Sequence, residues 1–154
     1  MSKFVFQLAG VLRHRERTEK DRQRDLAVAE AEMVRLQSEL HAMNDQIRQS
    51  IETVRTGLVG RLDMNDLAAH RRYLLGLQRK SFAVTEQIKR QQDVVRATRL
   101  ALVEAARQRK VLEKLEERQR RQWKAAMDRR EARELDELTT QLGFRALTAH
   151  REGG

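Results

Sequence analysis

The chain has 154 residues, of which 36% are charged and only 4% aromatic, and it contains no proline and no cysteine. This composition lacks the apolar bulk of a compact globular core, and the absence of proline favours a few long helices over many short elements. Without cysteine the chain can form neither a disulfide nor a thiolate metal site, which fits a reducing, cytoplasmic compartment. The net charge of +9 leaves nucleic acid, an anionic membrane surface and an acidic protein groove open as partners.

The first predicted element is a helix over about residues 4–57. Its opening apolar run is too short for a signal peptide, and nowhere does the sequence offer the ~20 consecutive apolar residues of a membrane-spanning helix. From Leu26 onward, apolar residues recur at alternating steps of three and four, which is the spacing of a coiled-coil seam. They are Ala29, Met33, Leu36, Leu40, Met43, Ile47, Ile51, Val54 and Leu58. The step from Ile47 to Ile51 is four where the heptad requires three, and this predicts a local shift in the phase of the seam.

A turn is predicted at about residues 58–65, where Gly57 and Gly60 end one helix and Asp63 is among the N-cap candidates for the next. The second helix is predicted over about residues 66–142, with a seam that runs in unbroken steps of three and four from Leu67 to Leu112. Polar seam members such as His70 and Gln91 can fix the register of the helices. Residues 143–154 are expected to form a disordered tail.

These elements predict an all-α fold, a long two-helix antiparallel coiled-coil hairpin in which the second helix is longer and overhangs the first. Residues 1–154 would form a single coiled-coil domain. Paired residue numbers should add to roughly 124, so that Leu40 faces Val84. A parallel dimeric rod with a kink at the glycines would show the same periodicity. The turn signals favour the hairpin, and we expect a monomer.

The basic charge is concentrated near one end of the predicted hairpin. Residues 107–133 carry eleven Lys or Arg against five Asp or Glu, so the open end is strongly positive while the turn end is nearly neutral. Charges that serve only solubility would be spread evenly, and the polarity therefore indicates a docking surface. Nucleic acid is the rival partner, but the aromatic residues that stack on bases are almost missing.

Nothing in the sequence predicts an active site, a cofactor or a metal centre. The four histidines lack cysteine or carboxylate partners at ligand spacing. Gly57 and Gly60 lack the following Lys and Ser or Thr of a phosphate-binding loop. We therefore expect no catalytic, cofactor-binding or metal-binding residues, and no enzyme activity.

Three stretches of the chain together resemble the flagellar export protein FliJ family in amino-acid sequence, order and spacing. They are residues 4–16, 101–119 and 129–138. The resemblance implies a stalk-like coiled coil of the flagellar type III export apparatus that binds the hexameric export ATPase. It also implies contacts with the export gate and with export chaperones. The expected location is cytoplasmic, peripheral at the cytoplasmic face of the inner membrane, with no nucleic acid and no integral membrane segment.

On this basis we expect the open end to enter the central opening of an ATPase ring. The residues expected to contact the ATPase are Phe4, Phe6, Leu8, Leu112, Leu115, Arg118, Arg121, Trp123 and Lys124. The aromatic members have a second interpretation as a hydrophobic clamp that closes the end of the hairpin. A further patch for the export gate or chaperones is expected near the turn, at Met43, Ile47, Tyr73 and Leu77, although seam packing would also explain it. The alternative function is a chaperone or structural coiled-coil adaptor that binds a partner helix.

Overall fold

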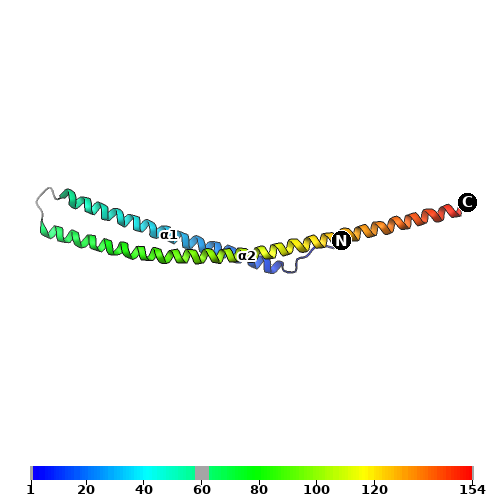
Figure 1. Ribbon diagram of the computed structural model, residues 1–154, viewed down its shortest axis with the longest axis horizontal. Helices are drawn as coiled ribbons and strands as arrows, with labels where there is room; N and C mark the ends of the chain where they lie inside the picture. Colours follow the sequence, from blue (N-terminus) through cyan, green and yellow to red (C-terminus); the bar gives the residue numbers. More distant parts are fainter. Residues whose placement is uncertain (1, 58–62, 154) are drawn as a thin grey trace. The chain divides into compact units, whose positions relative to one another are not determined.

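The computed structural model describes residues 2–57 and 63–153, and this part of the chain forms two helices, α1 (Ala9–Gly57) and α2 (Met64–Glu152) (Figure 1). With 89 residues, α2 is much longer than α1, which has 49. The described residues contain no strand. The predicted all-α class and the longer second helix are therefore confirmed. The chain divides into two units, Arg17–Ala106 and a second one formed by residues 1–16 with 107–154.

In the unit Arg17–Ala106, α1 and α2 lie side by side and antiparallel (Figure 1). Their seam is built from the buried residues Ala29, Leu36, Leu77, Val84 and Ala105. Every predicted seam position of α2 in this unit is buried or half-buried. Because α1 and α2 of one chain cover each other's apolar stripe, the hairpin is confirmed over the parallel dimeric rod.

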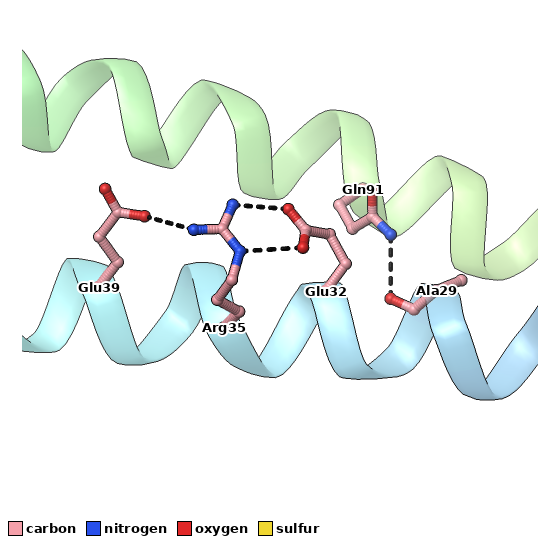
Figure 2. Close-up of polar contacts among 5 residues, drawn as sticks. All are labelled: Ala29, Glu32, Arg35, Glu39 and Gln91. Carbon is pink, nitrogen blue, oxygen red and sulfur yellow. Dashed lines mark hydrogen bonds and ion pairs between the residues drawn. The ribbon is translucent and has the colours of Figure 1, made fainter.

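Polar side chains fix the register of this helix pair. Gln91 on α2 donates a hydrogen bond from Nε2 to the backbone oxygen of Ala29 on α1, at 2.9 Å (Figure 2). Nearby on α1, Arg35 donates to both carboxylate oxygens of Glu32, at 2.7 and 2.9 Å, and to Glu39 at 3.2 Å. The Arg35 hydrogen bond holds the pKa of the Glu32 carboxyl below its ordinary value. Gln91 thus acts as the polar seam member that the sequence predicted.

The seam of α1 differs from the prediction near its end. Ser50 is buried at 6% exposure, whereas Ile51 is 49% exposed. The expected phase shift was therefore wrong, and the heptad step of three from Ile47 leads to Ser50. The reason is a polar pair across the seam, in which Nε2 of His70 lies 2.9 Å from both Oγ and the backbone oxygen of Ser50. A backbone carbonyl can only accept, so Nε2 carries the proton and donates it to that oxygen.

The N-terminus of α2 is capped by Asp63. Its Oδ1 accepts a hydrogen bond from the backbone N–H of Asn65 at 2.9 Å, and its backbone oxygen accepts from Leu67 at 3.1 Å. These are the contacts of an N-cap residue. Of the turn predicted at residues 58–65, positions 58–62 lie outside the described residues, and α2 begins at Met64.

The C-terminal end of α2 corrects another expectation. We expected the helix to end near residue 142 and residues 143–154 to form a disordered tail, but α2 continues to Glu152. Gly143 is the main helix-breaking signal there, and one glycine costs only about 1 kcal/mol relative to alanine. The residues that follow it are mostly helix-compatible, so the helix continues through this position. The single-domain organisation stays a prediction.

In the second unit, α1 begins at Ala9 rather than near residue 4. Residues 2–6 are not helical, and the backbone N–H of Ala9 bonds to the oxygen of Phe6 at 3.1 Å as the chain turns into the helix. An extended segment places side chains two residues apart on the same side, whereas a helix separates them. Phe4 and Phe6 can therefore both face α2 only because the helix starts after them.

Candidate docking surface

An aromatic cluster fixes the N-terminal segment to α2. The Phe4 ring lies 6.0 Å from the Trp123 ring, centroid to centroid, with the planes tilted by 55°. Cζ of Arg120 lies 5.3 Å from the centroid of the same Phe4 ring, and Arg120 also donates to Glu116 at 3.0 Å. A tilted ring pair and a cation over a ring face are both favoured by the charge distribution of aromatic rings. These contacts support the interpretation of Phe4 and Trp123 as a clamp.

Further contacts extend this attachment along α2. Arg15 donates from Nη1 to Oε1 of Gln108 at 2.6 Å, and the Ser2 hydroxyl lies 3.3 Å from the Met127 sulfur. Phe6 and Leu12 are buried, and Leu112 and Leu115 are half-buried. Sequence reasoning missed the pairing of Arg15 with Gln108 and of Ser2 with Met127, because no periodic pattern marks such single polar contacts.

The nine residues predicted for ATPase contact therefore separate into two groups. Phe4, Phe6, Leu112, Leu115 and Trp123 are at least half-buried, and the contacts described above give them a structural role. Leu8, Arg118, Arg121 and Lys124 are exposed. The second group is accessible to a partner.

A row of basic side chains follows one face of α2 in this unit. Lys110, Lys114, Arg118 and Arg121 are all exposed, and their steps of four, four and three residues place them on the same side of the helix. We call these four residues the basic face. Like charges at this spacing repel one another by a few tenths of a kcal/mol per pair, and exposed Glu117, on the same side of the helix, offsets only part of this repulsion. An acidic partner surface would relieve this repulsion, so the basic face is suited to docking on carboxylates.

The other predicted patch lies in the unit Arg17–Ala106. Met43 and Ile47 are half-buried and Leu77 is buried, whereas Tyr73 is 54% exposed. The Tyr73 ring lies 6.5 Å from the ring of His70. His70 in turn lines an apolar hollow together with Ile51, Val54, Leu67, Arg71 and Leu74. Tyr73 is thus the accessible member of this patch, and the other three predicted residues contribute to the helix seam.

The described residues contain no group of three or more His, Cys, Asp or Glu side chains that could bind a metal ion. In the same part of the chain, neither helix includes a stretch that is long and apolar enough to cross a membrane.

Comparison with known protein families gives a match over most of the chain. A protein-family model described as "Flagellar FliJ protein" matches residues 4–148. No curated protein and no solved structure matches the chain. The matched range includes the aromatic clamp, the basic face, all of α1 and most of α2.

Proposed function

Because the chain belongs to the flagellar FliJ protein family, we propose that it docks on the hexameric export ATPase through the unit that contains its N-terminal segment. The family is a non-enzymatic component of the flagellar export apparatus. The basic face, Lys110, Lys114, Arg118 and Arg121, is the observation that carries the proposal. These side chains would meet acidic groups that line the central opening of the ring, with Leu8 and Lys124 beside them.

The aromatic clamp supports docking indirectly. By fixing the N-terminal segment to α2, the contacts of Phe4 with Trp123 and Arg120 keep two chain segments together where the basic face is presented. A stiff, asymmetric helix pair in a ring contacts the ring subunits unequally. If the helix pair binds one state of the ring more tightly than another, it raises the population of the state that it prefers. Such a shift would promote ring assembly or ATP hydrolysis.

The second predicted patch extends the proposal to other partners of the export apparatus. Exposed Tyr73 and the apolar hollow near it would bind the export gate or an export chaperone. Such contacts would hold the protein at the cytoplasmic face of the inner membrane without a membrane segment of its own. Coupling between the ATPase and the gate would follow if both surfaces are occupied together.

A charge-reversal experiment tests docking. In the variant Arg118→Glu with Arg121→Glu, we expect the affinity of the protein for the purified ATPase hexamer to fall at least about tenfold. We also expect the variant to lose the ability to stimulate ATP hydrolysis by the hexamer. The matched control reverses Arg72 and Arg79, which are exposed on α2 in the other unit. Equal affinity of the two double variants for the ring, at the same salt concentration, would overturn the proposal.

A further inference from the structure

The first turns of α2 present three large apolar side chains to solvent. Met64 is 73% exposed, Leu75 46% and Phe82 68%. Leu75 follows Met64 by eleven residues and Phe82 follows Leu75 by seven. Because these spacings are close to three and two helical turns, the three side chains lie on one side of the helix. The buried seam residue Leu77 is two positions after Leu75, so this side points away from α1.

Three arginines lie among these apolar side chains. Residues 67–85 contain Arg71, Arg72, Arg79 and Lys80 and no acidic residue. Helical periodicity places the three arginines on the outward side and Lys80 beside it. All four cations are exposed, and none forms an ion pair with another described residue. We call this surface the outer face, and its residues are Met64, Ala68, Arg71, Arg72, Leu75, Arg79 and Phe82.

The acidic residues around the outer face do not neutralise it. On α1, each acidic residue between positions 39 and 57 pairs with a basic residue of the same helix. On α2, Asp63 caps the helix, and periodicity places Asp66 on the seam side. The next acidic residue on the outward side is Glu86, which pairs with Lys89 at 3.1 Å. The turn end is thus nearly neutral as a whole, but its outer face is positive.

The chemistry of the outer face matches that of a membrane surface. Apolar side chains flanked by cations, without an anion among them, are typical of a helix that lies in the plane of a membrane. Leu75 and Phe82 are long enough to enter the boundary between headgroups and acyl chains. Arginine stems can lie along that boundary while their guanidinium groups stay at the level of the phosphates. Anionic headgroups would supply the negative charge that the outer face lacks.

An acidic protein could supply the same charge, but the shape of the outer face favours lipid. A protein partner gains affinity from close shape complementarity. The outer face is the convex side of a single helix, whereas the apolar hollow at this end is lined by the seam-side residues Leu67, His70 and Leu74. A fluid lipid surface adapts to a convex helix, because each lipid moves independently of its neighbours.

We propose that the outer face of α2 binds anionic lipid at the surface of a membrane, with the helix lying along the membrane plane. Leu75 and Phe82 enter the headgroup region, and the three arginines contact lipid phosphates. Each cation near an anionic surface strengthens binding roughly fivefold, so three of them give about a hundredfold preference for anionic over neutral lipid. This binding is independent of ATPase docking, which uses Arg118 and Arg121 in the other unit.

Co-sedimentation of the full chain with lipid vesicles tests the proposal. The vesicles contain either phosphatidylcholine alone or about 30% phosphatidylglycerol, at about 0.1 M salt. We expect binding to the anionic vesicles, and at least about tenfold weaker binding for Arg72→Gln with Arg79→Gln. The matched control, Arg48→Gln with Arg55→Gln, removes two exposed cations from α1 in the same unit and should bind within about twofold of the wild type. Equal losses in the two double variants, or equal binding to both kinds of vesicle, would overturn the proposal.

Tryptophan fluorescence locates the contact. The variant Trp123→Phe removes the only tryptophan of the chain, and a new one is then introduced by Phe82→Trp or, as a control, by Val34→Trp on α1. Both positions are exposed, at 68% and 60%. With anionic vesicles, lipids brominated on their acyl chains should quench the tryptophan at position 82 and not the one at position 34. Equal quenching at both positions, or none at position 82, would overturn the proposal.

Poly-L-glutamate in solution separates an acidic protein partner from a membrane. Phe82→Ser removes an apolar contact without changing the charge, so it should weaken vesicle binding at least about fivefold and leave poly-L-glutamate binding unchanged. Binding of poly-L-glutamate that depends on Arg72 and Arg79, without binding to vesicles, would make the outer face a protein site and overturn the proposal. Circular dichroism verifies that all variants keep the helix content of the wild type. The ATPase assay contains no lipid, so reversal of Arg72 and Arg79 remains its control.

Discussion

The substitution Leu36→Ala tests the seam at its most buried point. Leu36 is 3% exposed, the lowest value among the described residues. The change removes three carbon atoms, and at about 0.8 kcal/mol for each buried methylene the lost transfer free energy is about 2.4 kcal/mol. The cavity adds little, because a layer only two helices thick can close over it. We therefore expect the free energy of unfolding to fall by about 2.5 to 3 kcal/mol.

Urea denaturation followed by circular dichroism at 222 nm measures this change. The matched control is Val34→Ala on the same helix, where the side chain is 60% exposed and the expected change is within about 0.5 kcal/mol. The slope of the transition should stay constant between the variants, since it reports the surface exposed on unfolding. If the two substitutions cost the same, or if Leu36→Ala costs less than about 1 kcal/mol, the reasoning from burial is refuted.

Three further predictions concern polar and backbone positions. Replacing Ser50 and His70 together by leucine should raise the free energy of unfolding by about 1 to 2 kcal/mol, because an apolar pair replaces a polar one in the seam. A thermal midpoint below that of the wild type would contradict this prediction. Gly143→Ala should slow amide hydrogen exchange in residues 144–151 by up to about fivefold. Alanine favours the helix over glycine by up to about 1 kcal/mol, and an added Cβ at residue 143 meets open space. An unchanged rate of exchange would contradict this prediction. Arg35 lowers the pKa of Glu32 below its ordinary value of 4.5, so the stabilisation by this pair is present at neutral pH and lost as pH falls through the lowered pKa. Glu32→Gln should therefore lose less stability than the wild type between pH 7 and pH 3, and equal losses in thermal melts would count against this pair.

Periodicity predicted most of the helix pair, including the polar seam members His70 and Gln91, but the expected seam did not include Ser50. The seam of α2 followed from steps of three and four alone, because burial in a two-helix pair is set by which face points at the neighbour. In α1 the apolar side chain of Ile51 was preferred to the heptad step that leads to Ser50, and this choice was wrong. The hydrogen bonds between Ser50 and His70 decide that position, and they depend on which residues lie opposite each other across the seam. A stripe in one helix does not contain that information.

The ends of the helices were predicted less well for a similar reason. The late start of α1 follows from Phe4 and Phe6 packing on α2, which is a tertiary effect. Gly143 predicted an end of α2 that a single glycine is too weak to impose. In the candidate docking surface, the sequence placed Arg118, Arg121 and Lys124 among the expected contact residues, and these three side chains are exposed. It could not separate the aromatic residues that are held in the clamp from the other residues, which are open to a partner. That separation depends on contacts between segments that are distant in the sequence.

The two polar contacts across the seam, from Gln91 to Ala29 and from His70 to Ser50, have a mechanical consequence. They lie three heptads apart on both helices and belong to the same register, so sliding one helix past the other would break both at once. Two rods that cannot slide along each other resist bending more than two rods that can. The unit Arg17–Ala106 should therefore respond to a sideways load as one stiff beam, and it would pass a displacement applied at one end to the other with little loss.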